Sequence, residues 1–97
     1  MSALFISRVT VKDPAKFKDY LRLSKDLAAQ HGAELLASGQ GPRTLSGNSS
    51  THQLAVVVRF PSMEKLEAWH DSKAYQALVP LRLEASDQEI TVYQMTG

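Results

Sequence analysis

The sequence contains no cysteine. Disulfide bonds, thiolate-bound zinc, iron–sulfur clusters and cysteine nucleophiles are therefore excluded. An excess of charge of one sign is also lacking, because 11 Lys and Arg residues stand against 10 Asp and Glu residues, which gives a formal net charge of +1. This balance provides no electrostatic basis for binding nucleic acid or an anionic membrane, and we expect neither as a partner.

Long apolar runs are missing as well. The longest one, residues 54–58, is far shorter than the roughly 20 residues that span a bilayer. Residues 1–8 reach a charge after too short an apolar run for a signal peptide, so we expect a cytoplasmic protein. What remains is an ordinary globular composition, 43% hydrophobic and 22% charged over 97 residues, which indicates a single domain, residues 1–97, with a thin core.

The first part of the chain reads as a strand followed by a capped helix. Residues 4–11 are rich in β-branched and aromatic side chains, which predicts a strand. Asp13 can cap a helix with its side-chain oxygen, and Pro14 suits the first helical position because its missing N–H costs nothing there. Apolar residues at helical spacing predict a helix over 14–31, and Gly32 follows where a left-handed helix end favours glycine.

Two further strands are expected next. Residues 33–38 form a short extended stretch, and 44–46 are a candidate for its resumption after a glycine-rich interruption. That interruption is no dinucleotide fingerprint, because it does not open a helix. Residues 53–60 form the clearest strand, with valines and leucine and no breaker.

The last part repeats the helix-then-strand order. Ser62 can cap a second helical region, which Asp71-Ser72 interrupts and Pro80 kinks or divides into two short helices. Residues 86–88 read as a loop, and residues 89–95 as the final strand.

The order of elements is therefore β-α-β-β-α-β, which is typical of the α+β ferredoxin-like fold. Right-handed crossovers then give a four-stranded antiparallel sheet with the helices on one face. The strand at 53–60 is apolar on both sides, because Leu54, Val56 and Val58 point one way while Ala55 and Val57 point the other. The helices cover only one face, so we expect a homodimer in which the other faces of two sheets meet.

Residues along the whole chain resemble a known family. The matching residues are Asp13-Pro14, Phe17, Tyr20, Gly32, Phe60-Pro61-Ser62, Trp69, Ser72, Tyr75-Gln76 and Leu81-Arg82. With these the chain resembles the small bacterial proteins called "domain of unknown function 1330", in the dimeric α/β-barrel group, and residues 69–76 are the most specific part. The resemblance implies the fold and a dimer but no general activity. More distant barrel relatives include cofactor-free monooxygenases, isomerases and heme enzymes, among which fold alone cannot choose.

The chain departs from the family pattern at two positions. Ala33 stands where a second glycine is common, and His70 stands where a tyrosine often follows the tryptophan. If position 70 lines a pocket, the change alters what fits there. A histidine beside Trp69 and the helix break can serve as a donor or general base, although it has no visible orienting partner in the sequence.

The remaining candidate residues each have a structural and a functional interpretation. Trp69 and Tyr75 are core or interface anchors, or they line a cavity for an apolar or aromatic ligand. Arg59 and Arg82 form structural ion pairs, or they face an anionic ligand. Together with His70 these residues are the predicted site for a small, partly aromatic or anionic molecule.

No metal site is predicted. The three histidines have neither the mutual spacing nor the carboxylate spacing of a known metal motif. His31 suits an interaction with the end of its helix, and His52, beside a glycine- and serine-rich turn, is expected to be exposed to solvent.

Three functions remain open. The first is binding of a small organic molecule between helices and sheet, with no resident cofactor. The second is a cofactor-free monooxygenase or isomerase of the same fold, and the third is a structural or interaction module with a filled core. An apolar pocket without titratable groups favours binding, a pocket with perturbed histidine or arginine partners favours an enzyme, and no pocket favours the third.

Overall fold

The computed structural model describes residues 1–96, so Gly97, the last residue of the predicted domain, lies outside the described part. Residues 1–96 form four strands and four helices. The strands are β1 (Ala3–Val11), β2 (Glu34–Gln40), β3 (Leu54–Phe60) and β4 (Ser86–Gln94). The helices are α1 (Pro14–Gln30), α2 (Met63–Asp71), α3 (Lys73–Gln76) and α4 (Val79–Ala85).

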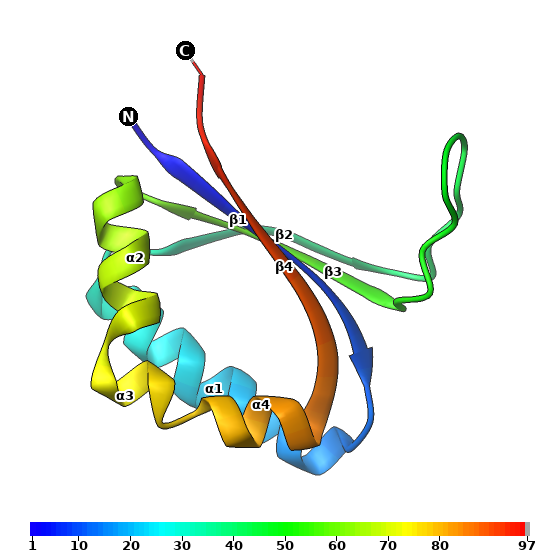
Figure 1. Ribbon diagram of the computed structural model, residues 1–97, viewed down its shortest axis with the longest axis horizontal. Coiled ribbons are helices and arrows are strands. Elements are labelled where there is room, and N and C mark those ends of the chain that lie inside the picture. Colours follow the sequence, from blue (N-terminus) through cyan, green and yellow to red (C-terminus); the bar gives the residue numbers. More distant parts are fainter. Residues whose placement is uncertain (97) are drawn as a thin grey trace.

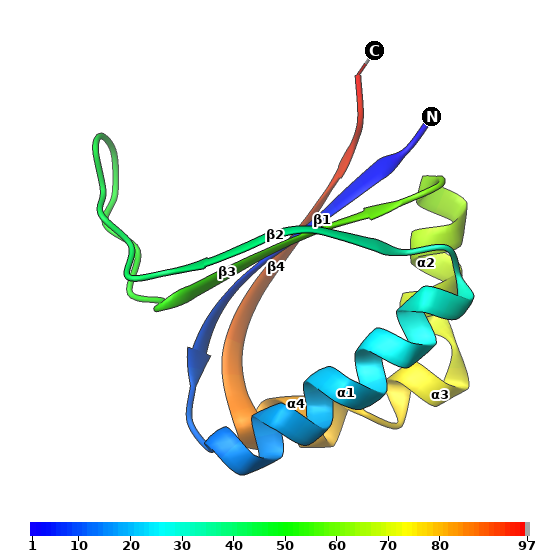
Figure 2. The ribbon, with the colours of Figure 1, turned by 180° about the vertical axis from the view of Figure 1, so that it is seen from behind.

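The strands form one antiparallel sheet in the order β2-β3-β1-β4. All helices lie on the same side of this sheet (Figure 1). Seen from behind, α1 runs alongside α4, against which it packs (Figure 2). This is the ferredoxin-like βαββαβ arrangement, as predicted from the sequence.

The face of the sheet that the helices cover, here called the inner face, carries the core. Cross-strand pairing places Phe5 opposite Val58 and Val9 opposite Leu54, and the alternation along each strand directs these side chains inward. The buried apolar side chains come from β1, the end of β3 and the four helices: Ala3, Phe5, Val9, Phe17, Tyr20, Ala28, Phe60, Leu66, Trp69, Tyr75 and Ala85.

The predicted signals at the two ends of α1 are confirmed. The Asp13 carboxylate accepts a hydrogen bond from the backbone N–H of Lys16 at 3.1 Å, and Pro14 is the first helical residue. At the other end, Nδ1 of His31 lies 3.0 Å from the carbonyl oxygen of Leu27, one of the last carbonyls of the helix. Local side-chain chemistry therefore sets both limits of α1.

Ser72 divides the second helical region. Its hydroxyl donates to the carbonyl of Trp69 at 2.7 Å and accepts from the backbone N–H of Tyr75 at 3.1 Å, so one side chain ends α2 and begins α3. Pro80 lies in the first turn of α4, where its missing N–H is tolerated. The break at Ser72 and the division near Pro80 were both predicted.

Two sequence predictions were wrong. Residues 86–88 belong to β4 rather than to a loop, because they pair with β1: Ser86 lies opposite Val11 and Gln88 opposite Val9. Residues 44–46 do not resume β2 but lie in the long β2–β3 connection, which projects away from the rest of the molecule (Figure 1).

The opposite face of the sheet, here called the outer face, is not covered by any element of residues 1–96 (Figures 1 and 2). Ile6 and Val57 lie opposite each other there, and Leu4 lies opposite Tyr93, whose side chain is 52% exposed. Ion pairs flank this apolar stripe, Arg8–Glu89 at 2.7 Å and Arg59–Glu34 at 2.6 Å.

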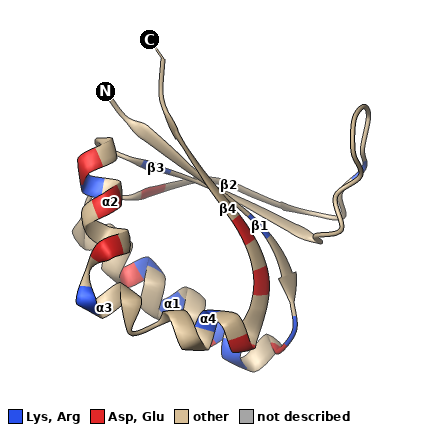
Figure 3. Ribbon diagram, viewed as in Figure 1, with Lys and Arg blue, Asp and Glu red and all other residues tan. Residues whose placement is uncertain are grey.

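Charges of both signs are mixed over the helices α1 and α2 (Figure 3). Among residues 1–96, none of the helices combines the length and the apolar character that a membrane crossing requires.

Candidate functional site

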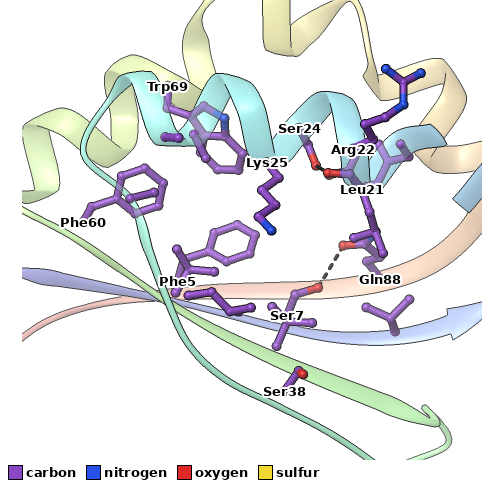
Figure 4. Close-up of a pocket in the computed structure, with 18 of the residues that line it drawn as sticks. Phe5, Ser7, Leu21, Arg22, Ser24, Lys25, Ser38, Phe60, Trp69 and Gln88 are labelled. Carbon is purple, nitrogen blue, oxygen red and sulfur yellow. Dashed lines mark hydrogen bonds between the residues drawn. The ribbon is translucent and has the colours of Figure 1, made fainter. Parts of the chain in front are cut away.

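A cavity of about 440 Å³ lies between α1 and the inner face of the sheet (Figure 4). This volume is within the range of small-molecule sites. Most of its lining is apolar, and the lining residues are Phe5, Ser7, Val9, Phe17, Tyr20, Leu21, Arg22, Ser24, Lys25, Ala28, Ala29, Ala33, Leu35, Ser38, Val56, Val58, Phe60, Trp69 and Gln88.

Aromatic rings build one end of the cavity. The ring of Trp69 packs edge-on against Phe5, with centroids 5.4 Å apart, and lies 5.3 Å from the ring of Phe60. These three side chains come from α2, β1 and β3, so the helix–sheet packing itself positions them. Such a cluster offers flat, apolar surface to a ligand at low conformational cost.

Trp69 also carries a buried polar group. Its side chain is 4% exposed, and its Nε1 has no hydrogen-bond partner within residues 1–96. A buried N–H without an acceptor costs roughly 1–3 kcal/mol relative to a satisfied one. This N–H is fully buried, so Trp69 offers the cavity the apolar surface of its ring and not its polar group.

Hydroxyl and amide groups line the β1–β4 side of the cavity. The Ser7 hydroxyl donates to Oε1 of Gln88 at 2.8 Å, a contact visible in Figure 4. Nε2 of Gln88 in turn donates to the hydroxyl of Ser86 at 3.0 Å, and that hydroxyl donates to the carbonyl of Arg82 at 3.1 Å. The amide is thus held at both ends, which fixes the polar wall in one orientation.

A buried hydrogen-bonded chain stands behind the cavity. Nη1 of Arg82 donates to the hydroxyl of Tyr75 at 2.9 Å, and that hydroxyl lies 2.7 Å from the hydroxyl of Tyr20, whose residue lines the cavity. Burial raises the pKa of Tyr20 well above its usual value, and the neighbouring Tyr75 hydroxyl raises it further. Tyr20 is therefore a neutral hydrogen-bonding group at physiological pH and not a base.

The structure brings three of the predicted site residues together. Trp69 lines the cavity, and Tyr75, which is fully buried, packs against it with ring centroids 4.4 Å apart. Arg82 reaches the Tyr75 hydroxyl and pairs with no carboxylate of residues 1–96. Tyr75 and Arg82 lie behind the wall and are not lining residues.

The other two predicted residues do not line the cavity. His70 is partly exposed, with Nδ1 3.3 Å from a carboxylate oxygen of Asp71, and its ring centroid lies 5.3 Å from that of Tyr75 and 6.3 Å from that of Trp69. Arg59 lies on the outer face and pairs with Glu34 at 2.6 Å. Of the two interpretations that the sequence allowed for Arg59, a structural ion pair or an anion-binding residue, this geometry matches the ion pair.

The expected exposure of His52 was wrong. Its side chain is 11% exposed, because the ring folds onto the sheet, with Nδ1 3.0 Å from the Thr10 hydroxyl and Nε2 3.7 Å from Glu89. Within residues 1–96, no group of three or more His, Asp or Glu side chains is placed to hold a metal ion.

Sequence reasoning missed the residues that α1 contributes to the cavity, among them Ser24 and Lys25. One signal was present, because Ser24 shares the apolar helical stripe of Phe17, Tyr20 and Ala28. A buried serine within such a stripe indicates a polar position in an otherwise apolar surface. Nothing comparable marks Lys25, an exposed lysine among several on the same helix.

Comparisons with known proteins bear on the family and the fold of the chain. The family model described as "Domain of unknown function (DUF1330)" matches residues 2–96. None of the curated proteins matches the chain.

Solved structures share the fold. A protein of unknown function from Rhodopseudomonas palustris has a TM-score of 0.81 at 15% identity, over 99% of this chain and 83% of that one. SnoaB, a cofactor-independent oxygenase from Streptomyces nogalater, has a TM-score of 0.71 at 10% identity, over 99% and 94%. A dimeric ferredoxin-like protein of unknown function from Thermobifida fusca has a TM-score of 0.59 at 18% identity, over 98% and 92%.

Proposed function

Since the chain belongs to the DUF1330 family, for which no general activity is known, we propose from its cavity that it is a cytoplasmic homodimer that binds a small organic molecule between α1 and the sheet. The observation that carries this proposal is the 440 Å³ cavity lined by Phe5, Phe60 and Trp69. A structural module with a filled core has no use for such a space.

The dimer part of the proposal rests on the outer face. Leu4, Ile6, Val57 and Tyr93 form an apolar stripe there, and another copy of the same face is its simplest cover. The ferredoxin-like protein from Thermobifida fusca, which shares the fold, is described as dimeric. In such a dimer Arg59 lies near the interface and takes no part in ligand binding.

A cofactor-free monooxygenase is the second candidate, and the fold that the chain shares with SnoaB favours it. Binding without turnover has the stronger support. The described lining residues include no histidine or carboxylate, and the raised pKa of Tyr20 removes it as a base at neutral pH. His70, the candidate donor or base of the sequence, is not among the lining residues.

Tryptophan fluorescence tests the binding proposal, because Trp69 is the single tryptophan of the chain and lines the cavity. We expect a screen of small aromatic and apolar molecules to find compounds that change its emission in a saturable way. Val56→Phe, which places a ring in the cavity, should abolish binding. Val57→Phe, one residue along on the outer face, should retain it.

Two results would count against the proposal. If no compound changes the emission, or if Val56→Phe binds as well as the unchanged protein, the ligand does not occupy this cavity. Oxygen uptake, measured with an electrode on any compound that binds, separates an oxygenase from a binding protein.

A further inference from the structure

The charges around the cavity have one sign. Two basic residues of α1, Arg22 and Lys25, are among the lining residues, while the described lining contains no aspartate or glutamate. The protein as a whole is nearly neutral, so this local imbalance is not a consequence of composition. A cation that faces a cavity without a competing carboxylate in the lining favours a ligand that carries negative charge.

The side chains of these two basic residues point in different directions. The Lys25 side chain extends toward Phe5, and its ammonium nitrogen lies over the cavity (Figure 4). The guanidinium group of Arg22 points away from the cavity in the same view, and it lies 3.8 Å from the Asp19 carboxylate on the helix surface. No carboxylate of residues 1–96 pairs with Lys25.

The rest of the cavity suits an apolar body. Phe5, Phe60 and Trp69 form a flat aromatic end, and aliphatic side chains of β1 and β3 continue it. A small inorganic anion leaves this surface unused, whereas a long-chain lipid exceeds a space of about 440 Å³ that lies within one subunit. The lining therefore suits a ligand that combines one anionic group with a compact ring system.

We propose that the ligand class of this cavity is compact aromatic carboxylic acids, with the carboxylate held by Lys25 and the rings packed against Phe5, Phe60 and Trp69. This inference rests on the proposed binding function and specifies its substrate class. Lys25 also takes the place of Arg82 and Arg59, the two candidate anion-binding residues of the sequence, because Arg82 donates to Tyr75 behind the wall and Arg59 pairs with Glu34 on the outer face. An ammonium–carboxylate hydrogen bond is about twice as strong as one between neutral groups, so charge dominates the selectivity.

Isothermal titration calorimetry with a matched pair of probes tests the inference. The probes are 2-naphthoate and 2-naphthamide, which share their rings and shape and differ in charge. We expect the unchanged protein to bind the naphthoate about tenfold more tightly than the amide. Lys25→Met should remove this preference and leave the affinity for the amide unchanged.

Arg22→Met is the matched control. Arg22 lies three residues before Lys25 on the same helix and carries the same charge, but its side chain points out of the cavity (Figure 4). We expect this variant to keep the preference for naphthoate. Equal affinities of both probes for the unchanged protein, or an equal loss in both variants, would overturn the role of Lys25 while leaving binding in the cavity intact. If neither probe binds a protein that light scattering and circular dichroism show to be folded, the inferred ligand class is wrong, and the fluorescence screen with Val56→Phe decides separately whether the cavity binds another molecule.

Discussion

The Tyr20 hydroxyl shows how burial changes the chemistry of a single residue beside the cavity. Burial raises its pKa from the usual value of 10.0, and the adjacent Tyr75 hydroxyl adds to the effect. In the unfolded chain Tyr20 ionises near pH 10 and releases a proton that the folded state keeps. Above that pH the folded state binds more protons than the unfolded state, so stability falls as pH rises.

We expect this group to lower the free energy of unfolding by about 1.4 kcal/mol per pH unit above a pH of about 10. In Tyr20→Phe this dependence of the free energy of unfolding on pH should be absent, whereas Tyr93→Phe, which changes an exposed ring, should keep it. Urea unfolding at a series of pH values measures both. Identical slopes in the unchanged protein and in Tyr20→Phe would show that the buried hydroxyl ionises as freely as an exposed one.

Residue spacing predicted part of the candidate site. Helical periodicity placed Tyr75 and Arg82 on one stripe near Trp69, and the structure has these three in contact as a chain. Periodicity did not predict which stripe of α1 faces the cavity, because that depends on how the helix packs over the sheet. The sequence therefore did not indicate Lys25 as a site residue, although both ends of its helix were predicted.

At the scale of elements, the turn between α1 and β2 depends on Gly32. Its φ is +81°, and an added Cβ atom would lie 2.6 Å from Cγ of Pro61. Side chains disfavour this left-handed backbone, and Pro61 is held in a ring that cannot swing aside. The glycine thus permits both the turn and the close approach of the two loops that end α1 and β3.

Gly32→Ala should reduce the free energy of unfolding by at least about 1–2 kcal/mol, the usual cost of a left-handed alanine, with the steric overlap in addition. Gly39→Ala is the control, because no atom lies within 4 Å of an added Cβ there and its φ is not positive. Guanidinium denaturation measures the free energy of unfolding of both variants. Backbone entropy alone makes alanine stabilising relative to glycine, so a loss in Gly39→Ala as large as that in Gly32→Ala would show that the left-handed backbone and the contact with Pro61 do not account for the effect.

Helices were easier to predict than strand limits in this chain. Asp13, Ser62 and Ser72 cap helices through bonds to residues three positions away, so the signal is local and visible in the sequence. Residues 86–88 have a loop-like composition and become strand only by pairing with β1, more than seventy residues earlier. Such a partner leaves no trace in a local pattern, which explains the misplaced start of β4.

At the scale of the whole molecule, the outer face allows the dimer to be tested. Val57→Asp places a charge at the centre of the apolar stripe without touching the inner face, so we expect it to weaken association and leave the subunit folded. Leu83→Asp, at an exposed position on α4, should leave the dimer intact. Light scattering after size-exclusion chromatography gives both masses, and a stable monomer of the unchanged protein at micromolar concentration would contradict the sheet-face dimer.

The strand order has a consequence for the order of events in folding. β1 is an inner strand whose two neighbours, β3 and β4, come late in the chain, and Ala3 pairs with both Phe60 and Gln94. Closing such long loops is entropically unfavourable, so the chain should fold more slowly than the microseconds typical of helical bundles. On the ribosome, β1 emerges first, but its second partner strand, β4, is available only after nearly the whole chain has been translated. Until then one edge of β1 has no partner and can pair with other chains.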